Sequence, residues 1–307
     1  MKRFFILASA AIVALASCAK TEVVYKDAPE EIALKAYTGV MTKAPHEGTS
    51  MPTSSSMMVY ASQSTTEDGT YTPYFSAKPF TYGTTWTGSQ YWPESGYLKF
   101  LAYYPSTLGT QTGDAVNGVT LTVTDINQTD LLYSNLTNAQ KCDTKPTAAL
   151  TFNHALAQIQ VKLAVADGKM ANVTVNSVAI TTPNIGGVFS FGASSAEWTS
   201  KTPAGANLVM NKSLSANLET TAAAFGEGAL VVPGAQTSLV IDYAVAGLSK
   251  QETVELSTYG NWDAGKKYVY NVTISLDEIQ LTASVADWDE DTKNNDDVAD
   301  EYPVTIS

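Results

Sequence analysis

Residues 157–165 read Ala-Gln-Ile-Gln-Val-Lys-Leu-Ala-Val, and this stretch decides the fold class. Its branched apolar residues fall at every second position, at Ile159, Val161, Leu163 and Val165. Successive side chains of a β-strand point to opposite faces, so the alternation gathers these four side chains on one face. The pattern predicts a strand with one face against a core and the other in water.

The same alternation recurs in other parts of the chain, at 239–245, 268–276 and 279–285. Further segments are rich in Thr, Val and Tyr, which are frequent in strands, and we expect strands at 57–62, 97–104, 119–124, 130–134, 172–180, 187–191, 229–232 and 252–258. No long stretch has convincing helical spacing with caps. A dozen or more short strands predict an all-β protein built from antiparallel sandwiches.

The chain has 307 residues, which is long for one sandwich and sufficient for two domains. We therefore expect two antiparallel β-sandwich domains in tandem, with a boundary near 166–168. The expected organisation is a signal peptide at 1–17, an N-terminal segment at 18–52, sandwich domains at 53–168 and 169–288, and an acidic spacer with a final strand at 289–307.

The N-terminus has the parts of an export signal in order. Lys2 and Arg3 form a short basic start, and residues 4–15 are apolar except for one serine. This run is shorter than the approximately 20 residues of a membrane span. Leu15-Ala16-Ser17-Cys18 resembles a bacterial lipobox, which predicts cleavage before Cys18 and palmitate-type acylation of its thiol. The alternative is an ordinary secretory signal followed by a chance cysteine.

The chain is acidic, with a formal net charge of −12 that becomes −14 once the two positive charges of the leader are removed. This charge gives no electrostatic footprint for nucleic acid, so we expect no nucleic-acid partner. The only cysteines are Cys18 and Cys142. If Cys18 carries lipid, Cys142 has no partner for an internal disulfide, and apolar cores must stabilise the fold.

Two near-matches to ligand loops fail at positions that matter. Residues 260–267 resemble a phosphate-binding loop, but Lys267 replaces the hydroxyl residue and a strand pattern follows. A turn in which Trp262 covers the core edge is the better interpretation. Asp287, Asp289 and Asp291 have calcium-loop spacing without the required glycine and glutamate, so we expect an acidic linker and leave weak calcium binding open.

The residues of common catalytic and metal sites are sparse. His46 and His154 are the only histidines, which leaves no zinc cluster, and no serine lies in a GxSxG motif. We interpret His154 as a hydrogen-bonded histidine at the edge of a core. The sequence therefore predicts no catalytic site, metal or cofactor. The aromatic pairs at 91–92 and 103–104 fit either sugar stacking or ordinary core packing.

The two ends of the chain carry matching apolar patterns. An early segment alternates at Ile32, Leu34, Ala36 and Val40. After the acidic spacer, the last residues alternate at Tyr302, Val304 and Ile306. A lone apolar strand beyond such a spacer cannot bury itself, so it requires its own domain or another molecule.

Several motifs occur in an order and spacing that resemble the fimbrillins, the type V pilins of Bacteroidetes. Thr42-Lys43-Ala44 follows the early strand, and residues 151–161 (Thr-Phe-Asn-His-Ala-Leu-Ala-Gln-Ile-Gln-Val) are the most specific match. The other matching segments are 91–93, 98–105, 130–133, 230–233, Trp262 with 265–268, and 285–288.

The resemblance implies export as an outer-membrane lipoprotein, proteolytic removal of the 32–40 strand and polymerisation by strand exchange with other fimbrial subunits. In the family the cut usually follows arginine, whereas here Lys43 precedes Ala44. Residues 302–306 would then be the donor strand for a neighbour. The resemblance also implies adhesion, with a host or bacterial surface ligand, and leaves shaft, anchor and tip positions open. The alternatives are a surface lipoprotein that binds glycans without polymerising and, as the weakest, an enzyme.

Overall fold

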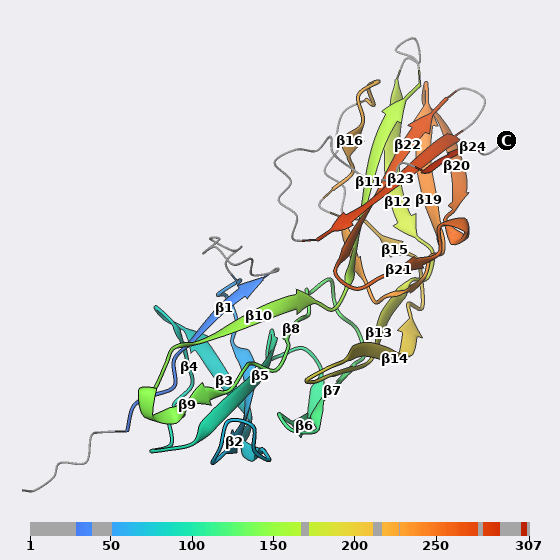
Figure 1. The fold of residues 1–307 in the computed structure, drawn as a ribbon. Helices are drawn as coiled ribbons and strands as arrows, with labels where there is room; N and C mark the ends of the chain where they lie inside the picture. Colours follow the sequence, from blue (N-terminus) through green and yellow to red (C-terminus); the bar gives the residue numbers. More distant parts are fainter. Residues whose placement is uncertain are drawn as a thin grey trace, which may run out of the picture.

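The computed structural model describes residues 29–38, 51–166, 172–210, 217–226, 228–275, 279–288 and 302–305. These residues form β-strands and two short 3-10 helices, η1 (Cys142–Thr144) and η2 (Ser257–Tyr259), with no α-helix among them. The predicted all-β class is therefore confirmed. Figure 1 shows the strands in a lower and an upper group, joined where β10 leads into β11.

The lower group is an eight-stranded sheet in the order β2-β3-β4-β1-β10-β8-β5-β9. Because β2 also pairs with β5, the pairings close into a ring, which we call the strand ring, and only β9 lies outside it. Its members are β1 (Leu34–Thr38), β2 (Met57–Ser64), β3 (Thr72–Tyr82), β4 (Trp86–Thr87), β5 (Tyr97–Tyr104), β8 (Leu132–Ser134) and β10 (Ala148–His154), and β9 spans Gln140–Lys141.

The strand ring encloses an apolar cluster, which we call the ring core. Its members come from every part of the ring and include Leu34 on β1, Met57 on β2, Trp86 on β4, Phe100 on β5 and Phe152 on β10. All five side chains are buried. The strands of the ring therefore share one buried core.

A second sheet, in the order β14-β13-β7-β6, joins segments that are distant in sequence. It consists of β6 (Thr110–Asp114), β7 (Gly118–Val123), β13 (Asn184–Phe191) and β14 (Ala196–Pro203). The residues of β13 pair antiparallel with β7, from Gly187 opposite Val123 to Phe191 opposite Val119. Figure 1 shows β6 and β7 beside the lower group, with β13 and β14 above them toward the upper group.

The upper group has two larger sheets, with a small β18–β21 pair beside them. One sheet holds β11 (Ala157–Val165), β16 (Ala223–Ala224), β17 (Ala229–Val231), β22 (Lys266–Ile274), β23 (Ile279–Asp287) and β24 (Tyr302–Thr305). The other holds β12 (Val173–Ile180), β15 (Leu208–Val209), β19 (Ser238–Val245) and β20 (Leu248–Glu255), and the small pair is β18 (Gly234–Ala235) with β21 (Asn261–Trp262).

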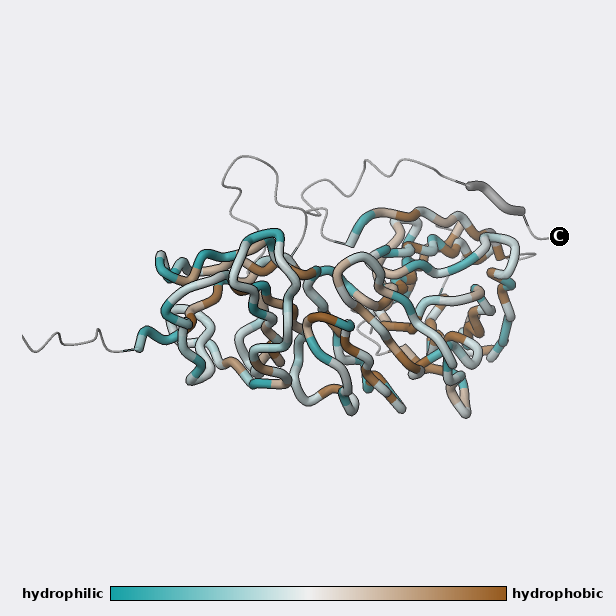
Figure 2. Tube along the Cα trace, turned by 60° about the horizontal axis from the view of Figure 1, so that its bottom comes forward, coloured by the Kyte–Doolittle hydropathy of each residue, from teal (hydrophilic) through white to brown (hydrophobic). Residues whose placement is uncertain are grey.

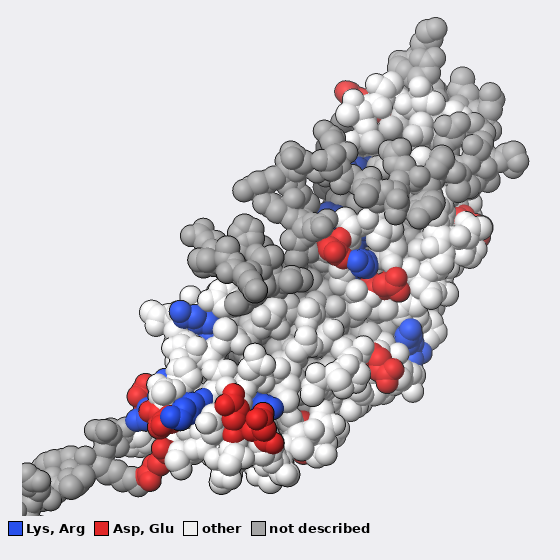
Figure 3. Space-filling view, in the orientation of Figure 1, with Lys and Arg blue, Asp and Glu red and all other residues white. Residues whose placement is uncertain are grey.

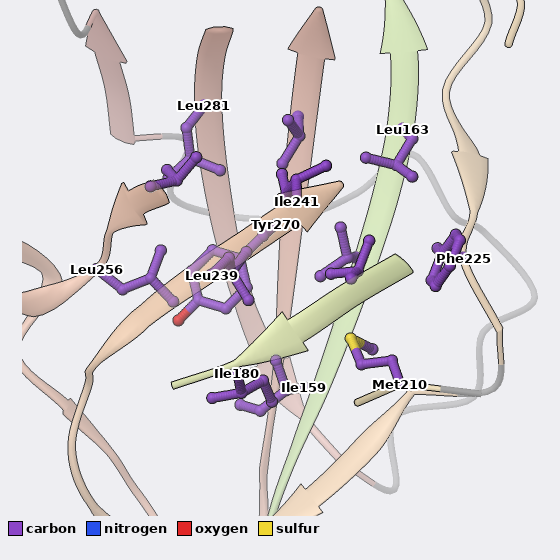
Figure 4. Close-up of a cluster of buried hydrophobic side chains, with 14 of the residues drawn as sticks. Ile159, Leu163, Ile180, Met210, Phe225, Leu239, Ile241, Leu256, Tyr270 and Leu281 are labelled. Carbon is purple, nitrogen blue, oxygen red and sulfur yellow. The ribbon is translucent and has the colours of Figure 1, made fainter. Parts of the chain in front are cut away.

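One apolar cluster lies between the two larger sheets. Ile159 and Leu163 of β11 contribute to it from one sheet, and Ile241 of β19 contributes from the other. Figure 4 shows these side chains around Tyr270 of β22. The alternation predicted for 157–165 is confirmed, because its four branched apolar residues are at most 3% exposed.

The hydrophobic segments are divided between the two halves of the molecule, as Figure 2 shows. A third apolar cluster joins them, with Leu101 and Tyr103 from the strand ring and Phe189 and Phe191 from β13. The β13–β14 hairpin belongs by sequence to the predicted 169–288 domain, yet it extends the β7 sheet. The domain limits and the tandem arrangement of two separate sandwiches stay predictions.

Candidate functional site

β1 closes the strand ring between β10 and β4. On one side it pairs in parallel with β10 over five residues, from Leu34 opposite Ala148 to Thr38 opposite Phe152. On the other side its only ladder pair is Leu34 with Trp86 of β4. A parallel pair needs a crossover connection, so β1 reaches this position without belonging to any hairpin.

The residues just before β1 fix its first half to the segment that follows β4. The Ile32 backbone N–H donates to the Gln90 carbonyl at 2.7 Å. The Trp92 N–H donates to the Glu30 carbonyl at 3.0 Å, and the Ser89 N–H donates to the Glu31 carboxylate at 2.6 Å. The segment from Glu30 to Leu34 is therefore held against residues 86–92, whereas no described ladder pair to β4 follows Leu34.

The inward residues of this segment belong to the ring core. Ile32 and Leu34 have no exposed surface, and Thr38 is 9% exposed. Ala36 lies between Leu34 and Thr38 on the same face and is only partly buried against the core. Burying an isoleucine or leucine side chain stabilises a fold by about 1.5–3 kcal/mol, so loss of β1 would expose the ring core.

A pocket of about 250 Å³ lies beside the second half of β1. Residues 34–37 of β1 line it, together with Met51, Thr53 and residues 84–86. Tyr82 also lines the pocket, and its ring packs against Trp86 with centroids 5.4 Å apart. The pocket thus opens where the pairing between β1 and β4 ends.

The structure pairs the predicted donor strand within its own chain. β24 lies antiparallel to β23, with Tyr302 opposite Ala283 and Val304 opposite Leu281. β24 is the last strand on its side of this sheet, so its other edge has no ladder partner among the described residues. In this structure the final strand is therefore paired within its own chain and not with a second molecule.

The remaining predicted processing residues lie outside the described part of the chain. These are Cys18, Val40, Lys43, Ala44 and Ile306. The lipidation site and the cleavage site therefore stay predictions. Among the described residues, no helix is both long and apolar enough to span a membrane.

Three segments singled out by their motifs meet between the lower and upper groups. Nδ1 of His154, at the end of β10, lies 2.8 Å from a carboxylate oxygen of Asp130. The His154 ring stacks on Trp288 with centroids 4.0 Å apart and planes inclined by 3°. The Trp288 N–H donates to the Gly265 carbonyl, and the Gly265 N–H donates to the Leu156 carbonyl. The acidic spacer therefore begins directly after a residue that is fixed at this junction.

Trp262 occupies a core rather than a phosphate-binding loop. It is 1% exposed, and its Nε1–H donates to the Tyr270 hydroxyl at 2.9 Å. The Tyr270 hydroxyl in turn donates to the Gln236 side-chain carbonyl at 2.6 Å. Residues 263–265 connect β21 to β22, so the predicted turn with Trp262 at the core is confirmed.

The described residues do not assemble a metal site, since no group of three or more His, Cys, Asp or Glu side chains lies together among them. On the face in Figure 3, acidic and basic side chains lie close together at the lower left. Two ion pairs in the lower group are Lys141–Asp143 at 2.8 Å and Lys145–Glu30 at 3.7 Å. The Lys145–Glu30 pair adds another contact between the segment before β1 and the rest of the lower group.

The aromatic pairs proposed for sugar stacking are mostly core residues. Trp92, Tyr103 and Tyr104 are at most 6% exposed, whereas Tyr91 is 45% exposed. Tyr82, which was not singled out by sequence, is 49% exposed beside the pocket. Of the two predicted pairs, only Tyr91 therefore presents substantial surface to solvent.

A sequence profile of the fimbrillin-like family matches residues 42–288. A search of curated protein sequences gave no match. Among solved structures, a fimbrial protein from Bacteroides vulgatus has 19% identity and a TM-score of 0.60, covering 84% of this chain and 99% of that chain. Candidate cell adhesion proteins from Bacteroides uniformis and Bacteroides ovatus have 20% and 15% identity and a TM-score of 0.54 each. They cover 84% and 85% of this chain and 99% and 98% of their own.

The profile spans most of the sequence, so the chain belongs to the fimbrillin-like family. The resemblance predicted from its motifs is confirmed. At these identities the solved structures show a shared fold. Family membership indicates a fimbrial, adhesion-related subunit of a cell-surface appendage that associates with other fimbrial subunits.

Proposed function

We propose that the chain is a fimbrial subunit whose β1 is exchanged for a neighbour's C-terminal strand during polymerisation. The observation that carries this proposal is the position of β1 in the strand ring. β1 contributes buried side chains to the ring core but is not part of a hairpin. It is therefore a segment whose removal leaves the other strands connected and a long apolar site open.

A cut between Lys43 and Ala44 gives this geometry a mechanism. β1 ends at Thr38, and the next described residue is Met51, so the cut falls on the only covalent link from β1 to the following strands. After cleavage, β1 is held by pairing and side-chain contacts alone. A strand that makes better contacts can then replace it, because exchange no longer requires the ring strands to separate from their own chain.

The donor in this proposal is the segment containing Tyr302, Val304 and Ile306. The spacer from 289 to 300 has 12 residues and spans at most about 40 Å when extended. Like charges favour extension of such a linker. Among the described residues β24 pairs with β23 alone, so its departure would break a single ladder.

The proposal also includes export of the chain as a lipoprotein. Acylation of Cys18 would anchor the precursor in the outer membrane, since two or more acyl chains give stable attachment. Cleavage at Lys43 separates Cys18 from the rest of the subunit and would release the polymerising part from the lipid. Adhesion to a host or bacterial surface ligand would be carried by the assembled fimbria.

Truncation after Trp288 tests the exchange. Removing the spacer and β24 leaves the strand ring and the upper core complete, so we expect a folded monomer that accepts a donor but cannot provide one. It should end polymers of the full-length subunit when mixed with them. Normal polymers from the truncated chain alone would rule out this donor, and failure to fold would identify β24 as an ordinary internal strand.

A further inference from the structure

The side chain that β1 presents at Ala36 is small for its position. The inward residues around it, Ile32 and Leu34, are fully buried in the ring core. Ala36 continues the same face with a single methyl group, and the 250 Å³ pocket lies against it. Apolar cavities of about 150 Å³ accommodate a benzene ring, so the space here is sufficient for a branched or aromatic side chain.

The pocket is open to solvent and borders the ring core. Leu34, Met51 and Trp86 line the pocket and are also members of the ring core. Met51 and Trp86 are 4% and 2% exposed and form a buried apolar part of a lining that also includes Thr53, Thr84 and Thr85. When β1 departs, Met51, Tyr82 and Trp86 stay with the subunit and form the permanent wall of this space.

The pocket also lies on the side of β1 where, among the described residues, the pairing to β4 has ended. The first half of the segment pairs with residues 86–92 through Glu30, Ile32 and Leu34. The half that contains Ala36 is paired only with β10 among the described residues. This half is nearest in sequence to Lys43, so the end freed by cleavage is the end beside the pocket.

The C-terminal segment carries larger side chains than β1 does at this point. Its alternating residues are Tyr302, Val304 and Ile306, and each is larger than alanine. Suppose that such a strand enters the site with these residues facing inward and one of them at the position of Ala36. It then presents a side chain larger than alanine to the pocket, whether it runs parallel or antiparallel to β1. The chain thus carries, at its own end, a segment whose side chains match the unfilled space.

We propose that the pocket at Ala36 is the part of the strand site that β1 leaves unfilled and that a second copy's C-terminal strand fills. This inference rests on the proposed strand exchange and adds its driving force. β1 completes the strand ring of the precursor but does not fill the pocket. The incoming strand is favoured because its side chain fills that space. Ala36 is then the residue that keeps β1 replaceable.

The test measures displacement of β1 from the folded chain after a single cut at Lys43. A synthetic peptide of residues 299–307 is added at increasing concentration, and the released N-terminal fragment is measured by mass spectrometry. Ala36→Val adds two methyl groups that fill the pocket from β1. Each buried methylene-sized group changes an equilibrium constant about fourfold, so the half-displacement concentration should rise about fifteenfold.

Ala36→Thr is the matched control, because threonine has the shape and strand preference of valine but carries a hydroxyl group. It should stay close to the unaltered chain. Equal displacement of the unaltered and Ala36→Val chains would overturn the pocket inference and leave strand exchange intact. No displacement of the unaltered, nicked chain at any peptide concentration would instead overturn the proposed function.

A second series keeps the inference falsifiable if Ala36→Val impairs folding. Peptides with Tyr302→Ala, Val304→Ala or Ile306→Ala are tested against the unaltered nicked chain. At least one of them should lose displacing power about tenfold, because it no longer fills the pocket. Equal potency of all three with the parent peptide would overturn the inference.

Discussion

Leu34→Ala should destabilise the strand ring by about 3 kcal/mol. Leu34 has no exposed surface, lies in the ring core, and forms the only ladder pair between β1 and β4. The substitution removes three carbon atoms, which corresponds to about 2.4 kcal/mol of lost transfer free energy at about 0.8 kcal/mol each. The adjoining pocket means that the new space is not refilled, and a cavity term adds to the cost.

Hydrogen exchange read by mass spectrometry is the appropriate assay, because a chain with several cores need not unfold in one transition. Amides of β10, which pair directly with β1, should lose protection corresponding to about 3 kcal/mol. Amides of β22 in the upper sheets should be unchanged. Lys35→Ala, at the adjacent exposed position, is the control and should change stability by no more than about 0.5 kcal/mol. A change below about 1 kcal/mol in β10 for Leu34→Ala would refute the assignment of β1 as a core strand.

Burial raises the pKa of the Cys142 thiol to about 11, and the charge of Asp143 adds to the shift. Labelling is measured in a Cys18→Ala chain at pH 8, where Cys142 is the remaining thiol. The folded protein should react with a thiol reagent about a hundredfold more slowly than the unfolded protein. The thiol of the unfolded chain ionises near pH 8.5, so the stability that comes from burying the neutral Cys142 thiol is present below that pH and is lost as the pH rises toward 11. Equal labelling rates in the folded and unfolded states would contradict the raised pKa. Trp288→Ala should increase hydrogen exchange at Gly265 and the adjacent residues because the stack on His154 is lost, whereas Val285→Ala on the preceding strand β23 should not. Unchanged protection at Gly265 would show that the stack does not hold the junction. Cys18→Ala should abolish lipid labelling and remove the protein from the membrane fraction, and persistent labelling would exclude Cys18 as the acyl acceptor.

The strands with clear alternation were predictable from sequence, because one buried face imposes a period of two. The segment at 97–104 was predicted with the bounds of β5, and the alternation at 159–165 lies within β11. β3 was not predicted, since Pro73 and Pro79 interrupt its pattern. Its pairing with β2 also shifts register between Val59 and Ala61, which breaks any simple period.

Long-range pairing could not be read from local patterns. The alternation at 32–40 predicted an apolar strand, but the parallel partner of β1, β10, begins more than 100 residues later. The contact between Asp130 and His154 was equally invisible, although both residues lay in motifs noted for other reasons. The pocket depends on the small size of Ala36 and on the early end of the pairing between β1 and β4. The alanine can be seen in the sequence, whereas the end of the pairing can be seen only in the structure.

The N-terminal mass of the subunit in assembled fimbriae tests the central claim most directly. The account predicts a polymerised subunit that begins at Ala44 and lacks lipid, together with a membrane-bound precursor that begins at an acylated Cys18. Assembled subunits that still begin at Cys18 and retain β1 would contradict strand exchange as the means of polymerisation.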